Sequence, residues 1–245
     1  MQRSLLITGA AGRIGRMLTS TFGERYTLRL TDTQPIATAA HPFMQADLSS
    51  IDTLAALCDG IDTVVHLAAD PSTEAVWESL LPSNIVGVYH IYEAARRAGC
   101  RRVVFASSVN AVSGYPRETQ VHPLMLPRAG NLYGATKAWG EVLGQHYADH
   151  HGLSVLCLRF GAVVPPDDDY WIVPDHPLLH IVLTYRDCAQ LVRCAVDAPD
   201  TVRYGIFHGV SNNRYQKLDL AETRAILGYQ PVDDSFALAE TRRST

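Results

Sequence analysis

The chain has 245 residues, of which 47% are hydrophobic and 19% charged, and its formal net charge is −4. This composition supplies one large globular core, and a negative charge without a large basic cluster argues against a nucleic-acid-binding surface. The N-terminus leads directly into a core strand without a signal peptide, and no apolar run is long enough to span a bilayer, so we expect no membrane association and a soluble, cytoplasmic protein.

The cysteines are five in number and form no C-x-x-C pair. Most of them fall in apolar helix or strand patterns, which indicates buried free thiols in a reducing cytosol. They are Cys58, Cys100, Cys157, Cys188 and Cys194.

Residues 3–32 read as a strand, a glycine turn, a helix, a second strand and an acid. Gly9, Gly12 and Gly15 recur at every third position after the apolar run that ends at Ile7. The pattern predicts a dinucleotide site, with Gly9 in a tight turn, Gly12 where the backbone approaches a pyrophosphate, and Gly15 where the helix packs on the strand. A glycine-rich turn without a ligand is the alternative interpretation.

Asp32 ends the second strand, about 20 residues beyond the glycines, where a carboxylate accepts hydrogen bonds from an adenosine ribose. Its negative charge would repel a 2′-phosphate. The stretch therefore favours NAD over NADP.

Strand and helix patterns alternate along the rest of the chain. Strands are expected at 43–46, 62–69, 102–106, 153–160 and 204–208. Helices are expected around the apolar positions Ile51, Leu54 and Leu57, at 74–99 with a break near Pro82, at 131–151, from 185 onward, and at 218–227. Either Ser49 or Ser50 suits the cap of the first of these helices. The alternation predicts an α/β fold of Rossmann type, a doubly wound parallel sheet with helices on both faces.

We find no internal repeat or linker, so residues 1–245 are expected to form a single domain. The irregular stretches 161–185 and 210–245 are the candidates for a small substrate cap. The acidic run Asp167–Asp169 in the first of them is typical of a solvated loop. It has no His or Cys at metal-ligand spacing, so no metal site is predicted.

Polar and small side chains occupy the predicted carboxyl ends of the strands, the edge where doubly wound sheets bind ligands. Ser107, Ser108 and Asn110 follow one central strand, although Ser and Asn also favour turns. Tyr133 and Lys137 are four residues apart and share one helix face, a spacing that carries little meaning alone.

Two further polar residues occur inside predicted elements. His66 has no ligand-spaced partner and is interpreted as structural. Asn84 lies within a helical pattern, where Asn competes with the backbone for hydrogen bonds, and the pattern leaves a surface position as an equal alternative.

The chain as a whole resembles the extended short-chain dehydrogenase/reductase superfamily, in its NAD-dependent epimerase/dehydratase group. The resemblance covers nearly the whole length, with the motifs in the family's order. They are TGAAGRIG at 8–15, Asp32, Asp47-Leu48, HLAA at 66–69, Asn84, the serines at 107 and 108, YGATK at 133–137, LRFG at 158–161 and LGYQPVDD at 227–234.

This resemblance implies a catalytic Ser108, Tyr133 and Lys137. The chemistry agrees, because an ammonium one helical turn away and the positive nicotinamide of NAD⁺ would both favour the phenolate of Tyr133, whose ordinary pKa is about 10. Tyr133 would take the proton of a substrate hydroxyl while a hydride leaves the same carbon. Ser108 would hydrogen-bond that oxygen, and Lys137 would also hold the nicotinamide ribose.

The resemblance also implies the cofactor contacts, and in its light Asn84 is expected to have a structural or proton-relay role and Arg159 to support the site. The implied cofactor residues are Gly9, Gly12, Arg13, Ile14, Gly15, Asp32, Asp47, Leu48, Leu67, Ala68, Ala69, Tyr133 and Lys137. The candidate substrate contacts are Ser72, Ser108, Asn110, Tyr133 and Trp171.

Within the family the chain resembles the uronate dehydrogenases, which oxidise hexuronic acids with NAD⁺. It shares LRLTD at 28–32, NIVGVYHIYEAAR at 84–96, VFASS at 104–108 and LYGATKAWGE at 132–141. The residues after Phe160 must complete the sheet as well as bind substrate, so a small sugar without a nucleotide is expected.

Three positions depart from the uronate dehydrogenase pattern. Val109 and Asn110 stand where an Asn and a His are expected, and Trp171 stands where an Arg would clamp the sugar carboxylate. Losing such a clamp costs about 1.5 to 3 kcal/mol of binding. Arg186 or Arg117 is a candidate replacement, while Trp171 would suit stacking on a neutral sugar ring.

The resulting hypothesis is an NAD-dependent oxidoreductase acting on a small, unactivated sugar or sugar acid, with a uronate among the candidates. The first alternative is an epimerase or dehydratase that retains its NAD through a keto intermediate. The second is a regulatory NAD-binding protein that performs no catalysis. The helices at 74–98 and 131–151 resemble the pair that forms the family's dimer interface, so a homodimer is expected.

Overall fold

The computed structural model describes residues 2–36, 40–165 and 167–241. Its main sheet has seven strands in the order β3-β2-β1-β4-β5-β6-β9, and each neighbouring pair is parallel. The strands are β1 (Ser4–Thr8), β2 (Thr27–Asp32), β3 (Phe43–Gln45), β4 (Thr63–His66), β5 (Arg102–Ser108), β6 (Ser154–Phe160) and β9 (Tyr204–Gly209). The predicted doubly wound α/β fold is confirmed.

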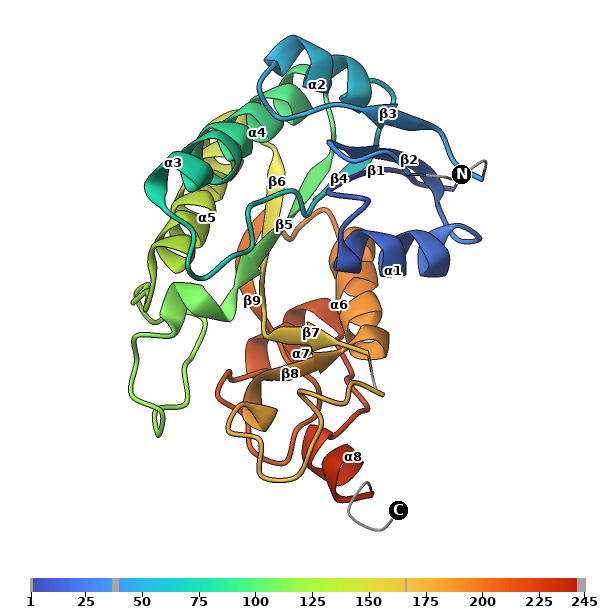
Figure 1. The fold of residues 1–245 in the computed structure, drawn as a ribbon. Helices are drawn as coiled ribbons and strands as arrows, with labels where there is room; N and C mark the ends of the chain where they lie inside the picture. The colour runs from blue at the N-terminus through green and yellow to red at the C-terminus, as the bar shows by residue number, and fades with distance from the viewer. Residues whose placement is uncertain (1, 37–39, 166, 242–245) are drawn as a thin grey trace.

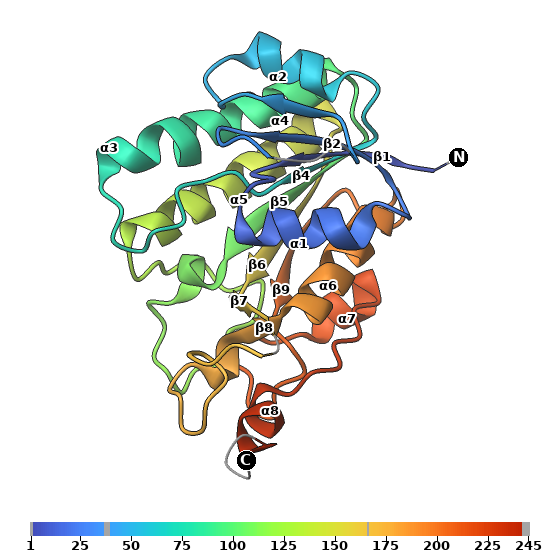
Figure 2. The ribbon, with the colours of Figure 1, turned by 45° about the vertical axis from the view of Figure 1, so that its right-hand side comes forward.

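Helices cover both faces of this sheet (Figures 1 and 2). On one face lie α1 (Arg13–Phe22), α6 (Tyr185–Asp197) and α7 (Ala221–Leu227), and on the other α2 (Ile51–Cys58), α4 (Gly87–Arg97) and α5 (Leu132–His151). The chain moves outward from β1 through β2 to β3 and then crosses back to β4. A parallel sheet that reverses direction in this way opens a crevice at the carboxyl ends of β1 and β4.

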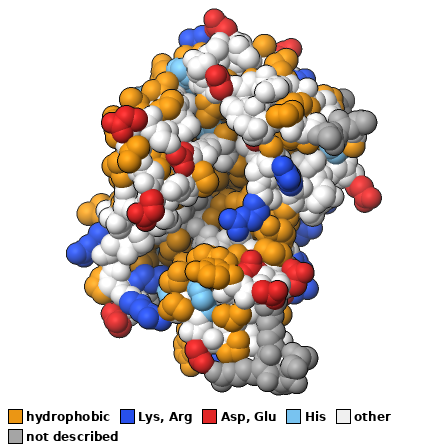
Figure 3. Space-filling model, viewed as in Figure 1, with side chains coloured by type: hydrophobic (Ala, Val, Ile, Leu, Met, Phe, Trp, Pro, Cys, Tyr) orange, Lys and Arg blue, Asp and Glu red, His pale blue; other side chains and the backbone are white. Residues whose placement is uncertain are grey.

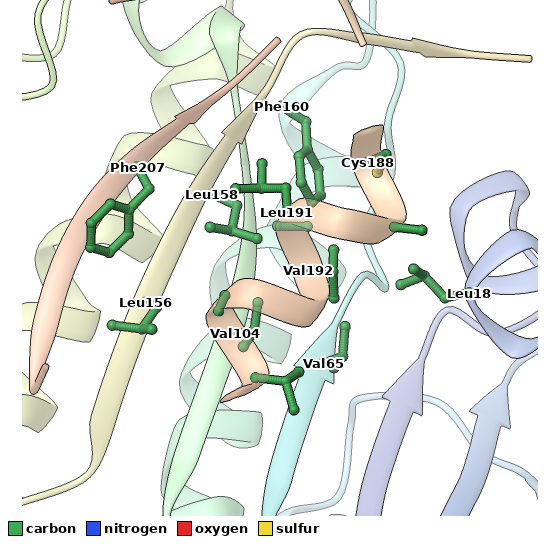
Figure 4. Close-up of a cluster of buried hydrophobic side chains, with 14 of the residues drawn as sticks. Leu18, Val65, Val104, Leu156, Leu158, Phe160, Cys188, Leu191, Val192 and Phe207 are labelled. Carbon is green, nitrogen blue, oxygen red and sulfur yellow. The ribbon is translucent and has the colours of Figure 1, made fainter. Parts of the chain in front are cut away.

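Each face of the sheet has its own hydrophobic core. Figure 4 shows α6 pressing Leu191 and Val192 toward Val104 of β5 and Leu158 of β6, all of them buried. The opposite core joins α2, α4 and α5 to the same strands. Because both faces are covered, the central strands are apolar along most of their length.

Helix ends follow the local sequence. Ser50, rather than Ser49, caps α2, and its side chain accepts a hydrogen bond from the Thr53 N–H at 3.2 Å. Ser49 instead hydrogen-bonds the Asp47 carboxylate through its N–H and hydroxyl.

The predicted helix at 74–99 is three pieces: α3 (Trp77–Leu80), a π-helix (Leu81–Val86) and α4. Pro82 lies in the second position of the π-helix. Proline has no N–H and its ring crowds the preceding turn, so the regular ladder widens there instead of continuing. The expected break near Pro82 is therefore confirmed, in the form of a bulge.

The stretch 161–185 is more ordered than the sequence predicts. It contains β7 (Ala162–Val164) and β8 (Val182–Thr184), which pair in parallel, and a 3₁₀ turn at Leu179–Ile181. A further helix, α8 (Ser235–Thr241), was not predicted and packs with them around Ile172 and Ala239. β7 and β8 have three residues each and lie in a stretch without apolar periodicity, so the sequence did not reveal these two strands.

The five cysteines are free, as expected, and Cys194 alone is partly exposed. No helix among the described residues is both long and apolar enough to cross a membrane.

Candidate active site

A cavity of about 1680 Å³ lies along the carboxyl ends of the strands, at the crevice that the strand order predicts. The space-filling view shows the hollow near the middle of this face of the molecule (Figure 3). Residues that follow β1, β2, β3, β4, β5 and β6 line it, together with the first turn of α1 and of α5. The glycine turn and the Tyr133–Lys137 pair therefore face one space.

The glycine turn is fixed by close backbone packing. Gly9 has a φ of +71°, and a Cβ there would lie 2.7 Å from the backbone nitrogen of Ala68. A Cβ on Gly15 would lie 2.3 Å from the carbonyl oxygen of Gly9, inside the turn. Neither position has room for another residue.

The turn ends at α1, whose N-cap is Gly12 and which has no side-chain cap. Arg13, Ile14 and Gly15 line the cavity there. The N–H groups at a helix N-terminus carry partial positive charge, so this end of the cavity suits a phosphate or pyrophosphate.

Asp32 is held in place at the end of β2. One of its carboxylate oxygens accepts the Ala11 N–H at 2.9 Å, and the other accepts the Gln34 N–H at 2.9 Å. The carboxylate lines the cavity beside the glycine turn. Asp47 and Leu48 line it after β3, and hydrogen bonds from Ser49 lower the pKa of Asp47.

Tyr133 and Lys137 project from the first turns of α5 into the cavity, with Ser108 at the end of β5. The Lys137 Nζ lies 5.5 Å from the centre of the Tyr133 ring and 5.1 Å from that of Phe105. Burial, offset in part by Glu141, lowers the pKa of Lys137 to about 8. The three side chains of the predicted catalytic set thus share one wall.

Burial dominates the ionisation of Tyr133. It raises the pKa of the phenol, although a hydrogen bond with Ser108 acts in the opposite direction. The charge of Asp70 raises this pKa further. In the chain alone burial therefore outweighs the groups that favour the phenolate, and the combined effect of the Lys137 ammonium and the nicotinamide of NAD⁺ stays a prediction.

Ser108 is oriented by its neighbours. Its hydroxyl accepts hydrogen bonds from the Asn110 N–H at 3.1 Å and the Asn110 side-chain amide at 3.2 Å. Asn131, the N-cap of α5, donates in turn to Asn110 Oδ1 at 2.9 Å. This chain of contacts ties the end of β5 to the start of the helix that carries Tyr133.

The remaining candidate substrate-binding residues fall into two groups, those that line the cavity and those that do not. Asn110 and Trp171 line the cavity, but Ser72 is exposed outside it and its hydroxyl accepts the Glu74 N–H. Ser72 turns outward because its own N–H is bound by the Asp70 carboxylate in a tight loop. Arg117 lines the cavity, whereas Arg186 pairs with Asp233 at the surface.

Asn84 is buried in the π-helix, and the surface alternative is wrong. Its amide donates to the Asp70 carbonyl at 3.0 Å and to the Thr136 hydroxyl at 3.1 Å, and its oxygen accepts the Asp70 N–H at 2.8 Å. Asn84 thereby joins the loop after β4 to α5, next to Lys137. His66 is also buried, in keeping with its interpretation as a structural residue, and its Nδ1 lies 2.7 Å from the Thr8 hydroxyl.

Sequence reasoning missed Glu141, which lies one turn beyond Lys137 on α5. It is buried and forms two hydrogen bonds with Arg159, at 2.7 and 2.8 Å, while Ser107 donates to it at 2.5 Å. Arg159 is buried and does not line the cavity, in keeping with a supporting role. The i, i+4 spacing of Lys137 and Glu141 was the available signal.

Sequence patterns also gave no sign of His180 and Lys217, which line the cavity together with Arg117. These three residues come from separate irregular segments. No periodic element links them.

A model of the NAD dependent epimerase/dehydratase family matches residues 5–179. The chain belongs to this family. The match extends from β1 to the 3₁₀ turn and includes the glycine turn, Ser108, Tyr133 and Lys137. The predicted family membership is confirmed, and NAD is the cofactor of this family.

Two relatives are similar over most of their length. An NAD-dependent glucose-6-phosphate dehydrogenase from Haloferax volcanii is 34% identical over 96% of this chain and 95% of its own. A uronate dehydrogenase from Pseudomonas putida is 34% identical over 94% of this chain and 84% of its own.

The fold is also similar to a solved structure, that of a mutant uronate dehydrogenase from Agrobacterium tumefaciens complexed with NAD. The TM-score is 0.89 at 31% identity, over 99% of this chain and 89% of the other. The uncapped start of α1, the oriented Asp32 and the cavity-facing Lys137 are features of this chain that fit such a cofactor.

Proposed function

We propose that this protein oxidises a small, unactivated sugar or sugar acid with NAD⁺, at a hydroxyl or hemiacetal carbon. The observation that carries the proposal is the single cavity shared by the glycine turn and by Ser108, Tyr133 and Lys137. The relatives that span nearly the whole chain act, by name, on sugars without an attached nucleotide. We also propose that the parts of 161–185 and 210–245 that contact this cavity act as a substrate cap on a single domain.

NAD⁺, when bound, supplies the hydride acceptor. In our proposal the backbone N–H groups at the start of α1 hold its pyrophosphate, Asp32 its adenosine ribose, and Asp47 and Leu48 its adenine. Lys137 holds the nicotinamide ribose, and Leu67, Ala68 and Ala69 form the wall beside it.

Tyr133 takes the proton of the reacting hydroxyl as the carbon loses its hydride, and Ser108 hydrogen-bonds the same oxygen. The positive charge of Lys137 stabilises the phenolate against the burial that raises the pKa of Tyr133. Asn110 acts by holding the Ser108 hydroxyl in position, which makes it a positioning residue rather than a direct substrate contact.

A panel of aldoses, uronates and sugar phosphates with NAD⁺, followed by NADH absorbance, tests the proposal. We expect turnover of at least one sugar, and a loss of about 10²- to 10⁴-fold in kcat for Tyr133→Phe. Tyr115→Phe, which changes a second tyrosine lining the cavity, is the matched control and should retain most activity. Equal rates for wild type and Tyr133→Phe would contradict the assignment.

Measurement of the NAD bound to the purified protein and of the sugars formed separates the proposal from an epimerase or dehydratase. Such an enzyme would be purified with stoichiometric NAD and would interconvert sugars without net NADH. If that outcome is observed and Tyr133→Phe is inactive, the catalytic residues stand as proposed, but the reaction is an epimerisation or a dehydration instead of a net oxidation.

We further propose a homodimer formed through the helices at 74–98 and 131–151, and a reducing, cytoplasmic location. Large apolar side chains are exposed along both helical regions, which supports burial against a second copy. They are Trp77, Val86, Tyr89, Leu132, Trp139 and Val142.

Light scattering after size-exclusion chromatography tests the dimer. We expect twice the monomer mass for wild type and a monomer for Trp139→Glu, because a charge at the centre of an apolar interface is costly. Ile226→Glu, at an exposed apolar position on α7, is the control and should remain dimeric. A monomeric wild type would contradict this interface.

A further inference from the structure

Three basic side chains from three separate segments line the cap side of the cavity. Arg117 comes from the loop between β5 and α5, His180 from the 3₁₀ turn before β8, and Lys217 from the segment between β9 and α7. Lys217 is only 8% exposed, which is unusual for a lysine.

Hydrogen bonds to backbone carbonyls hold these side chains together. Arg117 Nη2 donates to the Pro177 carbonyl at 3.0 Å, and the His180 ring hydrogen-bonds the same carbonyl. Lys217 Nζ donates to the carbonyls of Tyr115 and Pro116, the residues just before Arg117. Burial, and then the charges of Arg117 and Lys217, lower the pKa of His180, as expected if the three groups are close.

The hydrogen bonds within the cluster leave donors unused. A lysine ammonium has three N–H donors and a guanidinium has five, and the contacts above use two of Lys217 and one of Arg117. Because both residues line the cavity, the remaining donors are available to a ligand there.

Acidic side chains in the cavity lie elsewhere. Among the described residues, those that line it are Asp32 at the end of β2, Asp47 after β3 and Asp70 after β4. Glu118 acts on Lys217 and raises its pKa, after burial has lowered it, but Glu118 does not line the cavity. Among the described residues that line the cavity, the charged side chains on the cap side are therefore all basic.

We propose that Arg117, His180 and Lys217 form a recess that binds an anionic group on the sugar, either a carboxylate or a phosphate ester. The inference rests on the proposed function, in that the bound molecule is the sugar oxidised at Tyr133. Both groups match the planar fork of Arg and the point charge of Lys. The recess supplies the anion contact that Trp171 cannot make.

Binding to the protein–NADH complex, measured by calorimetry, tests the recess without requiring turnover. The ligands are glucose, glucuronate and glucose 6-phosphate. We expect at least one anionic sugar to bind roughly tenfold or more tightly than glucose. The preferred anion distinguishes a carboxylate from a phosphate site.

Arg117→Gln should remove most of this advantage, and Lys217→Gln provides a second variant from a different segment. Arg186→Gln is the matched control, since Arg186 is an exposed arginine paired with Asp233 outside the cavity. NADH titration establishes that each variant is folded.

Glucose binding as tightly as both anionic sugars would overturn the recess, as would an unchanged anion advantage in both Arg117→Gln and Lys217→Gln. Efficient oxidation of glucose with no anion preference would leave the proposed function standing and remove the recess. Anion binding that depends on Arg117, without NADH formation from any sugar, would support the recess and contradict the proposed function.

Discussion

The ammonium of Lys137 is placed where burial lowers its pKa from 10.5 to about 8. A group whose pKa is lower in the folded chain than in the unfolded chain binds fewer protons when folded. Folding therefore carries a cost below pH 8, and this cost diminishes as the pH rises from about 8 to 10.5. This cost arises at the residue that, in our proposal, holds the nicotinamide ribose.

Replacing Lys137 with Met should make the cofactor-free protein more stable while abolishing catalysis. We expect a gain of up to about 3 kcal/mol at pH 7, because the pKa is lowered from 10.5 to about 8. Thermal unfolding of both proteins between pH 7 and pH 10 measures it. The difference in stability should shrink with rising pH, and a less stable Lys137→Met protein at pH 7 would contradict the interpretation.

At the scale of elements, the π-helix at Leu81–Val86 is what turns Asn84 inward. The wider turn gives the Asn84 side chain contacts on both the loop after β4 and Thr136 of α5. A local irregularity of one helix thus fixes the distance between two elements that form the cavity wall.

Asn84→Ala should lower the free energy of unfolding by about 1 to 3 kcal/mol, because buried groups of Asp70 and Thr136 lose their partners. It should also lower kcat through misplacement of α5. Urea unfolding and NADH formation measure the two effects. Asn212→Ala, at an exposed asparagine outside the cavity, is the control, and a variant of Asn84 with wild-type stability and kcat would refute this role.

Sequence was sufficient for the long elements and for the residues that lie at their ends. Gly9, Asp32, Ser108 and Tyr133 could be placed beside one cavity because they stand at strand ends or at a helix start, whereas the catalytic roles of Ser108 and Tyr133 were implied only by the family resemblance. For the segments between the elements, the sequence was insufficient to place the side chains. Ser72, a candidate substrate residue, lies outside the cavity because one Asx-type turn at Asp70 directs it outward.

His180 and Lys217 were missed for a related reason. Their proximity to Arg117 depends on how three irregular segments pack, and no spacing along the chain encodes that packing. The π-helix was likewise visible only as a break at Pro82, since its hydrogen-bond pattern has no periodic signature.

At the scale of the whole molecule, two fully buried histidines, His66 and His208, make the free energy of unfolding depend on pH in the acid range. Burial is the main cause that lowers the pKa of each to about 3. The unfolded chain takes up these protons below pH 6.5, whereas the folded chain does not until about pH 3. The two neutral histidines therefore contribute to stability fully above pH 6.5, and this contribution is lost as the pH falls toward 3.

Between pH 6 and pH 4.5 the free energy of unfolding should fall by about 2.7 kcal/mol per pH unit, for two protons. His208→Leu should reduce this slope by about half, and His150→Leu, on the exposed end of α5, should leave it unchanged. Urea titrations across this pH range measure the slope. An unchanged slope in His208→Leu would show that other groups control acid unfolding.

The order in which the chain lines its cavity has a consequence for evolution. Residues 8–90 contribute the glycine turn and the acids after β2, β3 and β4, whereas the basic cap-side residues all come from 117–217. The two sets share no strand, so substitutions at Arg117, His180 or Lys217 alter the sugar-binding side without replacing any residue that lines the dinucleotide half. Relatives with this plan can differ in the sugar that they bind while they retain one cofactor, and exchanging the residues at Arg117, His180 and Lys217 between relatives should transfer substrate preference as a unit.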